Sequence, residues 1–324
     1  LVNNAISMIA AGNSVVFNAH PSAKNISAHS VQVLNDAIVR VGGPANLIAC
    51  IENPTIESAD QLFHHKGVRL ILVTGGAAVA RAALSSPKKS IVAGPGNPPV
   101  VVDETADIRK AARNIVDGAA FDNNVLCTGE KQCFVVASVA DELKREMVAY
   151  SAVELDTRQI DALTTVALPK GDDGEPHASR DFIGRNANVL ARVIGLDLPD
   201  ELRLLIGETD ALHPFVTVEQ MMPFLPIVRV RDVDEGIVLA IESEHGYRHT
   251  AVIHSKNIEH MHNMARAVDT TVFVKNGPSY AGLGVDGEGY STYSIAGPTG
   301  EGLTTARTFT RRRRCSLVDY FRIT

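Results

Sequence analysis

Cys127 is the residue of this chain whose surroundings best suit nucleophilic chemistry. It stands in the segment 118–131 (GAAFDNNVLCTGEK), between an Asp-Asn-Asn turn and a Thr-Gly step. Residues of these types break regular structure and leave an irregular backbone around the thiol. A thiol on such a loop can be exposed, and nearby N–H groups can stabilise its anion. The local residues leave two interpretations open: a reactive thiol, or one more small buried hydrophobic residue.

The other three cysteines, Cys50, Cys133 and Cys315, lie within strand-like stretches, and we interpret them as structural. None of the four cysteines belongs to a CxxC pair. This spacing argues against a zinc or disulfide framework and indicates a reducing compartment. Cys127 is therefore the one candidate nucleophile among them.

The segment Val73–Gly76 (VTGG) is a candidate cofactor-binding turn. It lies where a buried strand is predicted to end and a helix to begin, which is where parallel sheets bind ligands. Gly75 and Gly76 would let backbone N–H groups approach a cofactor, and Thr74 offers a hydroxyl. On spacing alone, an ordinary strand-to-helix turn is equally open. Another glycine pattern, GLGVDG at 282–287, resembles a dinucleotide fingerprint, but no helix follows it, so we interpret it as a loop.

Five histidines could suggest a metal site, namely His245, His249, His254, His260 and His262. The first two have helical ligand spacing, but Gly246 and the strand-like residues that follow do not suit a helix. A helix face could carry Glu259 and one histidine, yet two ligands do not complete a tetrahedral set. We therefore predict no metal site.

Composition and charge exclude several classes of protein. The chain has 324 residues, enough for two domains, and its 45% hydrophobic and 21% charged residues are ordinary for a folded protein. A net charge of −6 gives no indication of nucleic-acid binding. No apolar run approaches the ~18 residues that span a bilayer. The run Arg311–Arg314 is interpreted as an edge strand with a solvated or subunit-facing side.

Strand-like and helical runs alternate from residue 14 to residue 102, which predicts a parallel sheet covered by helices. The expected strands are Ser14–Phe17, Leu47–Ile51, Val68–Val73, Ser90–Ala93 and Val100–Val102. The expected helices are Leu1–Ala11, Ala28–Val41 (with Val31, Leu34, Ile38 and Val41 on one face), Ser58–His65 and Ala77–Ser85.

The rest of the chain continues this α/β mixture. Helices are predicted at Thr105–Ala119, Val139–Val153 (with Leu143, Met147 and Tyr150 on one face), Val233–Ser243 and Ile258–Val268. Strands are predicted at Gln132–Ala137, Leu202–Ile206, Ile227–Val230, Ala251–His254 and Thr271–Val274. Glycine- and proline-rich composition predicts loops at Leu168–Arg180 and Asn276–Gly302. The tail, Thr308–Ile323, has extended character.

Together these residues resemble the aldehyde dehydrogenase superfamily. The segment 11–17 (AGNSVVF) is similar to the family's second cofactor-domain strand, and 73–76 to its nicotinamide-side turn. The segment Glu219–Pro223 (EQMMP) is similar to the motif whose glutamate holds the nicotinamide ribose. The segment 121–131 is similar to the nucleophile loop.

Within that family, three stretches are most similar to the CoA-acylating propionaldehyde and acetaldehyde dehydrogenases of propanediol and ethanolamine utilisation. They are FDNNVLCTGEK, GPGNPPVVVD and the ending ARTFTRRRRCSLVDYFRI. The resemblance covers the whole chain, as the C-terminal part of such a subunit. Because the chain opens with Leu1 inside a helix-like segment, we expect upstream sequence, including the family's oxyanion-hole asparagine.

The resemblance implies an aldehyde dehydrogenase-like α/β fold in three parts. Residues 1–95 would be the remainder of a Rossmann-type, parallel-sheet NAD-binding domain, and residues 96–304 an α/β catalytic domain with the nucleophile loop. Residues 305–324 would form an oligomerisation strand that adds to a neighbouring subunit's sheet, giving a homo-oligomer (dimer or tetramer). The family also implies a cytoplasmic location within a bacterial microcompartment, whose shell would be a partner.

The resemblance further implies a cysteine thioester mechanism. The Cys127 thiolate would attack an aldehyde, and hydride would pass to NAD bound near Thr74, Gly75, Gly76 and Glu219. Coenzyme A would then enter the space vacated by NADH and accept the acyl group. The residues Asn18, His20 and Pro21 are expected near the adenosine end that the two share.

Hydrolytic members of the family carry a glutamate, in an ELGGK-like motif, that activates water. The corresponding stretch here, Ile91–Val102 (IVAGPGNPPVVV), contains no acidic residue. Water needs a positioned base, whereas a thiol such as coenzyme A is partly ionised and strongly nucleophilic. We therefore predict an acyl-CoA product from a short aldehyde, with propionaldehyde as the expected substrate. A hydrolytic aldehyde dehydrogenase and an inactive truncated assembly component stay open as alternatives, as do aldehyde chain length, oligomer size and NAD versus NADP.

Overall fold

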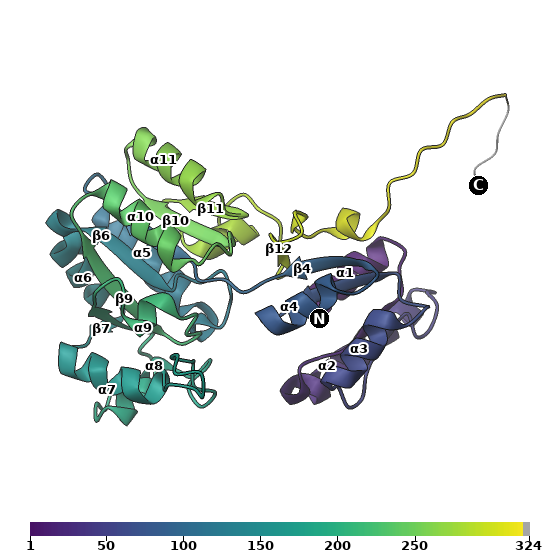
Figure 1. Ribbon diagram of the computed structural model, residues 1–324, viewed down its shortest axis with the longest axis horizontal. Coiled ribbons are helices and arrows are strands. Elements are labelled where there is room, and N and C mark those ends of the chain that lie inside the picture. Colours follow the sequence, from purple (N-terminus) through teal and green to yellow (C-terminus); the bar gives the residue numbers. More distant parts are fainter. Residues whose placement is uncertain (320–324) are drawn as a thin grey trace. The chain divides into compact units, whose positions relative to one another are not determined.

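The computed structural model (Figure 1) describes residues 1–319, apart from the side chain of Ala77. The chain divides into two compact units. The small unit comprises Leu1–Ile71, Ser86–Lys89 and the residues from Thr304 onward, and the large unit comprises Leu72–Ser85 and Ser90–Leu303. The domain boundaries expected from the sequence, 1–95, 96–304 and 305–324, stay a prediction.

The large unit is built on a seven-stranded sheet in the order β11-β10-β5-β6-β9-β8-β7, in which neighbouring strands are parallel. The strands are β5 (Pro99–Val102), β6 (Gln132–Val136), β7 (Ala152–Glu154), β8 (Leu204–Glu208), β9 (Phe224–Val230), β10 (Thr250–His254) and β11 (Val272–Lys275). Every residue of β5, β6 and β10 is buried. A parallel sheet needs helices on both faces to bury its strands in this way.

Alternate strand residues pack against different helices. Val100 and Val102 of β5 join a core with α5 (Ile108–Ala120) and α6 (Ala137–Tyr150). Val101 lies between them in sequence and joins the other core, with α10 (Val233–Ser243) and α11 (Ile258–Val268). The two-residue period of a strand therefore divides β5 between the two faces, and Figure 1 draws these helices around the sheet.

Several smaller elements complete the large unit. Helices α7 (Thr157–Ala167) and α8 (Ala187–Val193) cover Leu205 and Phe224 in a third core. The remaining elements are α4 (Ala77–Leu84), α9 (Pro214–Thr217), the 3-10 turns Phe121–Asn124 and Ser279–Leu283, and the short strands β12 (Ile295–Ala296) and β13 (Gly302–Leu303). Strands β3 (Leu70–Thr74) and β4 (Lys89–Ala93), each of which is divided between the two units, pair with each other.

The small unit has a two-stranded parallel sheet and a small core. Strand β1 (Val15–Phe17) pairs with β2 (Ile48–Cys50), beside α1 (Val2–Ala10), α2 (Lys24–Arg40) and α3 (Ile56–His64). Its buried apolar residues are Ala5, Val31 and Ile48. The side chain of Asn13 donates a hydrogen bond to the carbonyl of Phe309 (3.0 Å) and so ties the 3-10 turn Ala306–Phe309 to this unit.

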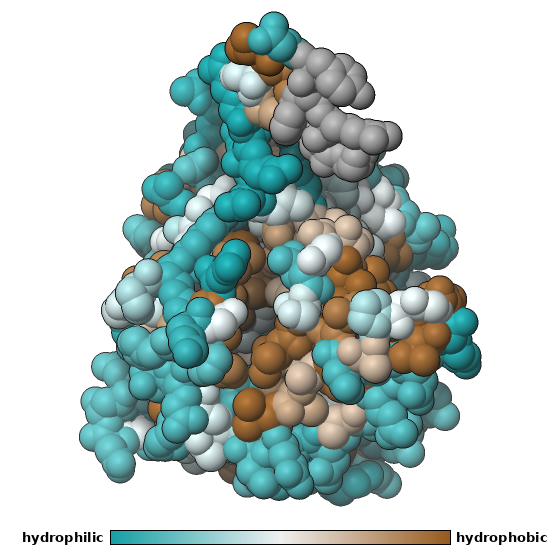
Figure 2. All heavy atoms as spheres, turned by 90° about the vertical axis from the view of Figure 1, so that its right-hand side faces the viewer, coloured by the Kyte–Doolittle hydropathy of each residue, from teal (hydrophilic) through white to brown (hydrophobic). Residues whose placement is uncertain are grey.

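Apolar side chains gather on the face that Figure 2 presents. Independently of that view, the exposed apolar residues of the small unit include Val2 and Ile6 of α1, which are 46% and 59% exposed, and Val41 after α2, which is 86% exposed. Exposed apolar groups that gather in this way commonly mark a surface covered by another chain or segment. None of the helices in the described part has both the length and the apolarity that a membrane crossing requires.

Most predicted elements are confirmed, and α10 and α11 have the predicted bounds. The predicted helix Val139–Val153 is wrong at its end. Helix α6 stops at Tyr150, because Ser151 takes a φ of 153°, and Ala152–Glu154 is the edge strand β7. Of the three residues predicted on one face of this helix, Leu143 and Met147 are buried and Tyr150 is exposed.

Further corrections concern α2 and two helices that were not predicted. Helix α2 begins at Lys24, four residues before its predicted start, and ends at Arg40, so Val41 is not on its buried face. Helices α7 and α8 lie in a stretch for which no element was predicted. For α7 the sequence carries a signal, since Asp156 and Gln159 form a capping box at its N-terminus.

The predicted loops are largely confirmed, but the predicted tail strand is not. The segment 168–180 contains only a single bridge, between Lys170 and Pro176. In the tail, the described residues 310–319 lie in no helix or strand, and residues 320–324 of the predicted strand fall outside the described part. Cys315 is exposed, which corrects its interpretation as a structural strand residue. Pairing of this tail with a neighbouring subunit stays a prediction.

Candidate active site

Four segments bring functional groups to the amino-terminal edge of the seven-stranded sheet. Cys127 precedes β6, Gly96 precedes β5, Glu219 precedes β9 and His249 precedes β10. These strands are neighbours and run parallel, so the segments that enter them lie at the same edge. Cys127 is half-buried, which leaves part of the residue open to solvent.

The nucleophile loop, residues 121–131, holds an unusual backbone conformation before the thiol. Asp122, Asn123 and Asn124 have φ values of 49°, 51° and 63°, in the left-handed region. Asparagine and aspartate tolerate this region better than other residues with a β-carbon. The side chain of Asn124 donates to the carbonyls of Ala119 (2.7 Å) and Glu130 (2.8 Å), which fixes the turn from inside.

Lys131 at the end of the loop is fully buried. Its Nζ donates to the carbonyls of Asn124 (2.6 Å) and Leu126 (3.1 Å) and to the side-chain oxygen of Asn124. Its backbone N–H donates to the carbonyl of Pro98 (2.9 Å), and its carbonyl accepts from the side chain of Gln220 (3.0 Å). Lys131 thereby connects the turn before the thiol to the strands behind it.

Glu130 is a second fully buried ionisable residue in the loop. Its carboxyl accepts hydrogen bonds from the backbone N–H (2.8 Å) and hydroxyl (2.7 Å) of Ser279. Burial raises the pKa of Glu130 to about 7, although the Ser279 hydrogen bonds oppose this. A β-carbon added to Gly118 would overlap the Glu130 carboxyl, so only glycine fits beside it.

The thiol and its nearest charges influence each other. Burial raises the pKa of Cys127 to about 11; the charge of Glu219 raises it further and the charge of Lys131 opposes. Burial also raises the pKa of Glu219, whose Oε1 accepts from the backbone N–H of Gly96 (3.4 Å). In this state the resting thiol is therefore protonated near neutral pH.

One expectation about this site needs correction. Because the segment Ile91–Val102 contains no acidic residue, the sequence predicts no carboxylate beside the thiol to activate water. The fold instead brings Glu219 from the segment before β9 into electrostatic range of Cys127. The sequence indicated Glu219 only as a cofactor ligand, because its approach to the thiol depends on the order of strands in the sheet.

Gly96 and His249 pack against the nucleophile loop and were missed as parts of this site. A β-carbon on Gly96 would lie 2.5 Å from the carbonyl oxygen of Cys127 and 3.0 Å from Cγ of His249. His249 is buried, and burial together with the charge of Lys131 lowers its pKa to about 4, so its ring is neutral. Its Nδ1 lies 2.9 Å from the hydroxyl of Thr250, and its Nε2 has no hydrogen-bond partner among the described residues.

Three buried amide side chains join the segments that form this edge. Asn97 donates to the carbonyls of Val216 (2.9 Å) and Ser243 (2.7 Å). Gln132 donates to the carbonyl of Asn97 (3.0 Å), and Gln220 donates to the carbonyl of Lys131. Because these bonds cross between β5, β6, β9 and α10, they hold the thiol and Glu219 on one fixed frame.

The predicted cofactor turn lies in the same unit as Cys127. Thr74, Gly75 and Gly76 are exposed between β3 and α4, and Thr74 Oγ1 lies 2.9 Å from the hydroxyl of Ser294. A β-carbon on either glycine would meet nothing within 4 Å. The backbone of the turn is therefore open to a ligand.

The residues predicted near the adenosine end, Asn18, His20 and Pro21, belong to the small unit and follow β1 directly. The side chain of Asn18 accepts from the hydroxyl of Ser58 (2.6 Å), and His20 caps the 3-10 turn Pro21–Ala23. Both His20 and Pro21 are exposed. They stand after the carboxyl end of a parallel strand, a position that commonly binds ligands.

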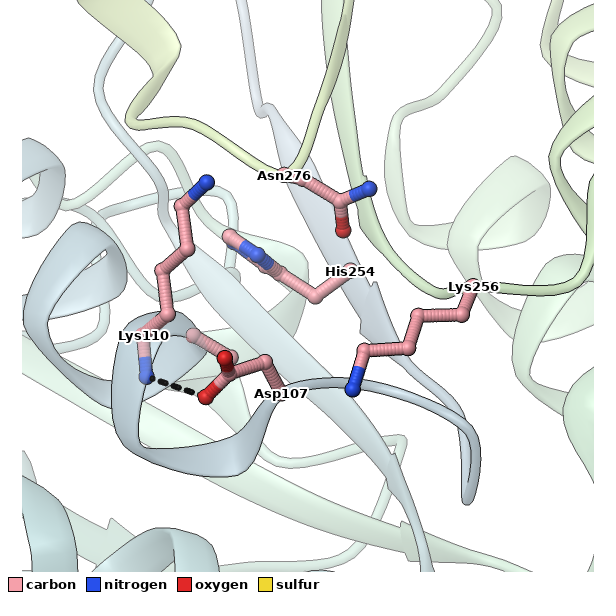
Figure 3. A pocket seen from close by; sticks show the side chains of 6 residues that line it. Asp107, Lys110, His254, Lys256 and Asn276 are labelled. Carbon is pink, nitrogen blue, oxygen red and sulfur yellow. Dashed lines mark hydrogen bonds between the residues drawn. The ribbon is translucent and has the colours of Figure 1, made fainter.

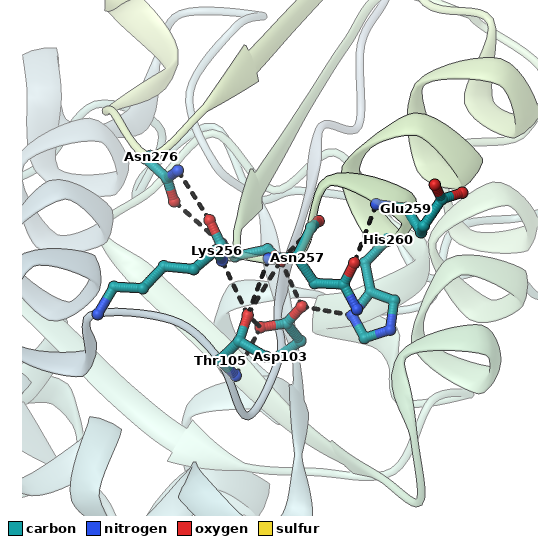
Figure 4. Close-up of polar contacts among 8 residues, drawn as sticks. Asp103, Thr105, Lys256, Asn257, Glu259, His260 and Asn276 are labelled. Atoms are coloured by element: carbon teal, nitrogen blue, oxygen red, sulfur yellow. Dashed lines mark hydrogen bonds and ion pairs between the residues drawn. The ribbon is translucent and has the colours of Figure 1, made fainter.

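The carboxyl edge of the seven-stranded sheet carries a different group of polar residues. A cavity of about 140 Å³ is lined by Asp107, Lys110, Ala111, His254, Lys256 and Asn276 (Figure 3). Beside it, the buried Asp103 accepts hydrogen bonds from Thr105 and Ser255 and pairs with Nδ1 of His260 at 2.7 Å (Figure 4). No residue predicted to bind substrate or cofactor lies there.

The five histidines do not converge on one point. His245 and His249 lie before β10, whereas His254 ends that strand and His260 and His262 belong to α11. Among residues 1–319, no group of three or more His, Cys, Asp or Glu side chains is arranged to hold a metal ion.

The sequence matches known proteins along its whole length. The model of the aldehyde dehydrogenase family matches residues 1–162. The acetylating acetaldehyde dehydrogenase EutE of Salmonella typhimurium is 55% identical over 325 residues, which are 100% of this chain and 70% of that protein. This chain belongs to the aldehyde dehydrogenase family. A second relative within the family is the CoA-propanoylating propanal dehydrogenase of Citrobacter freundii. It is 45% identical over an alignment that covers 100% of this chain and 69% of that protein.

Solved aldehyde dehydrogenase structures confirm the predicted α/β fold with a large parallel sheet. Rhodopseudomonas palustris propionaldehyde dehydrogenase with bound propionyl-CoA has a TM-score of 0.93 and 47% identity, over 97% of this chain and 69% of that one. Another structure of that enzyme contains CoA and an acylated cysteine. The propionaldehyde dehydrogenase of a Clostridium phytofermentans fucose utilisation microcompartment has a TM-score of 0.93 and 44% identity, over 99% and 73% of the two chains.

Proposed function

We propose that this protein is a CoA-acylating aldehyde dehydrogenase. It would oxidise a short aldehyde with a nicotinamide cofactor and transfer the acyl group to coenzyme A. The observation that carries this proposal is the half-buried residue Cys127 on a loop fixed by buried hydrogen bonds, in a chain 55% identical to an acetylating and 45% identical to a CoA-propanoylating enzyme.

In the first step, the Cys127 thiol loses its proton to solvent and Sγ attacks the aldehyde carbon. The product is a hemithioacetal with negative charge on the former carbonyl oxygen. The backbone N–H of Cys127 favours negative charge at its own side chain, since it lowers the pKa of the thiol, and we assign it as a donor to this oxygen. One such donor contributes ~3 kcal/mol to stabilisation of an oxyanion.

The cofactor would be held by Thr74, Gly75, Gly76 and Glu219. This assignment is supported by the exposed turn, where no described atom lies near the space above either glycine. When bound there, the cofactor accepts the hydride from the carbon attached to Cys127. The protein must then hold the sulfur and that carbon in place, which is the contribution of the nucleophile loop.

In the second step, the thiolate of coenzyme A attacks the carbon of the Cys127 thioester. The new carbon–sulfur bond forms as the bond to Cys127 breaks, and Cys127 leaves as a thiolate. We assign Asn18, His20 and Pro21 to the adenosine end of the shared nucleotide site, because they follow the carboxyl end of β1.

The Glu219 carboxylate favours a second candidate, a hydrolytic aldehyde dehydrogenase. It lies within electrostatic range of Cys127, and burial raises its pKa, which makes it a stronger base. A carboxylate in such a position could activate water against the thioester. The two candidates differ in whether turnover requires a thiol.

One assay separates the candidates. NADH formation is followed with acetaldehyde and with propionaldehyde, with and without coenzyme A, on the full-length protein and on Cys127→Ala. A burst equal to the enzyme concentration without coenzyme A, and sustained turnover with it, supports the acylating enzyme. Sustained turnover without coenzyme A contradicts it and favours hydrolysis. Cys127→Ala should lose at least about a thousandfold in rate, and Cys315→Ala, at an exposed cysteine, should lose nothing.

Three finer assignments belong to this proposal. We expect NAD rather than NADP as the preferred cofactor, although an engineered glycolyl-CoA reductase at 47% identity was solved with NADP+. We expect a homo-oligomer assembled through residues 305–324, and a location inside a bacterial microcompartment, as for the Clostridium phytofermentans relative. Reaction rates with each cofactor test the preference for NAD. Light scattering of the protein with and without residues 305–324 tests the homo-oligomer, and cell fractionation tests the location.

A further inference from the structure

Lys131 is a buried charge beside the nucleophile that none of the steps above uses. We propose that Lys131 is a positioning residue for Cys127: its ammonium holds the turn before the thiol, and its positive charge favours the thiolate. This inference rests on the proposed role of Cys127 as the nucleophile. It adds an electrostatic function to a residue four positions further along the loop.

The hydrogen bonds of Lys131 define what it can do. An ammonium has three N–H donors, and three acceptors surround this one: two carbonyls, of Asn124 and Leu126, and the side-chain oxygen of Asn124. All three belong to the residues immediately before Cys127. No donor remains for the sulfur, so Lys131 acts on the thiol through the shape of the loop and through its field.

Burial makes that field strong. Lys131 is 0% exposed, and a charge in a low-dielectric interior acts on its neighbours far more than a charge in water. The ionisable groups that feel it are Glu130, Glu219, Cys127 and His249. Burial lowers the pKa of Lys131 to about 8, so the ammonium form still dominates near neutral pH.

The surroundings of Cys127 explain why a nearby positive charge is needed to stabilise its thiolate. Burial and Glu219 both disfavour the Cys127 thiolate, and Lys131 is the residue whose charge opposes them. Glu130 cancels that charge only in part near neutral pH, since burial raises its pKa to about 7 and leaves a large fraction of its carboxyl groups protonated. Cys127 is a thiolate when it attacks the aldehyde, and it becomes a thiolate again when the acyl group passes to coenzyme A. The same ammonium stabilises both.

A purely structural role for Lys131 makes the opposite prediction. Loss of the three hydrogen bonds alone would loosen the turn and expose the sulfur to water. Because burial is the largest cause of the high pKa of Cys127, exposure would lower that pKa and speed alkylation at every pH. The direction of change therefore distinguishes the two roles.

The test is the pH dependence of Cys127 alkylation by iodoacetamide, with the label read by mass spectrometry. Lys131→Gln retains amide donors for the loop carbonyls but removes the charge, and Lys131→Arg retains the charge. We expect the midpoint of alkylation to rise by about one pH unit or more in Lys131→Gln, a tenfold smaller thiolate fraction at neutral pH. Lys131→Arg should stay close to wild type. The matched control is Lys110→Met, which removes an exposed lysine from α5 and should leave the midpoint unchanged.

An unchanged or lower midpoint in a folded Lys131→Gln protein would overturn the proposal. Thermal unfolding of each variant shows whether the fold is intact, and if Lys131→Gln does not fold, Lys131→Met with its similar side-chain length takes its place. Alkylation needs neither aldehyde nor coenzyme A. Failure of the proposed function would thus appear as absent turnover in the wild type, whereas failure of this inference would appear as an unmoved midpoint.

Discussion

The buried carboxyl groups at the two edges of the seven-stranded sheet have pKa values shifted in opposite directions. At the carboxyl edge, burial disfavours the Asp103 carboxylate, but hydrogen bonds from Ser255, His260 and Thr105 outweigh it and hold the pKa of Asp103 below its usual value. At the amino edge, burial prevails: the pKa of Cys127 and Glu130 is raised and that of Lys131 is lowered.

This difference indicates which edge performs chemistry. Parallel sheets commonly bind ligands at the carboxyl ends of their strands. Here the buried carboxylate of the carboxyl edge is satisfied internally, and the ionisable group that burial shifts at that edge is His254, whose pKa is lowered to about 3. The amino edge instead gathers a thiol, two carboxyl groups and an ammonium whose pKa values are all shifted by burial, as reaction sites do. We therefore expect substitutions at the amino edge to change reactivity, and substitutions at the carboxyl edge to change mainly stability.

The largest effect is expected from Gly118→Ala, under the nucleophile loop. Its methyl group would overlap the Glu130 carboxyl, so that buried carboxyl must leave its hydrogen bonds to Ser279, or else the loop or α5 must move. We expect a loss of about 3 kcal/mol or more in the free energy of unfolding, measured by urea denaturation, together with loss of turnover. Gly75→Ala, where a β-carbon meets nothing within 4 Å, is the stability control and should lose less than about 0.5 kcal/mol. Equal stability of the two variants would contradict the packing argument.

Next in size is Asp103→Asn at the carboxyl edge. The amide cannot replace a buried carboxylate that accepts from Thr105, Ser255 and His260. We expect a loss of about 2 kcal/mol in stability, with the alkylation rate of Cys127 in the folded protein unchanged. A changed alkylation rate would show that the edges are coupled.

Glu130→Gln should alter the pH dependence of stability. Because the folded-state pKa of about 7 exceeds the ordinary value of 4.5, the folded protein binds the extra proton between these values. Stability from this group is then full below pH 4.5 and falls as pH rises toward 7. The neutral amide removes that fall, so chemical denaturation at several pH values should give Glu130→Gln a flatter profile by up to about 3 kcal/mol. A parallel profile would mean that Glu130 is ionised throughout.

The smallest effect is expected from Lys256→Met, which removes an exposed ammonium from the cavity at the carboxyl edge. Steady-state kinetics should give kcat and KM for aldehyde and coenzyme A within about twofold of wild type, the usual range for a distant surface change. A tenfold rise in either KM would place substrate binding at this edge and reverse the comparison.

The sequence was informative where local pattern decides structure. Alternation of strand-like and helical runs predicted the sheet, and α10 and α11 were placed without error. The strand β7 was missed because three residues after a helix carry no pattern of their own, and only pairing with β8 makes them a strand. The tail was predicted as a strand from composition, yet a strand needs a partner, and none pairs with residues 310–319 in a single chain.

For the site, the sequence indicated the nucleophile but not its electrical surroundings. Cys127 stands out because turn residues surround it. Glu130 and Lys131 follow it as an ordinary charged pair, a type usually exposed, but tertiary packing buries both of them. The approach of Glu219 to the thiol likewise follows from β9 being the neighbour of β6, which no local pattern encodes.

The amides of Asn97, Gln132 and Gln220 have a practical consequence for anyone who redesigns this enzyme. Their hydrogen bonds join the segments that precede β5, β6 and β9 in the absence of any bound ligand. A nucleophile loop grafted alone onto another scaffold would lack these hydrogen bonds and would not hold one conformation. A graft should therefore include the nucleophile loop together with the three amide side chains that hydrogen-bond around it.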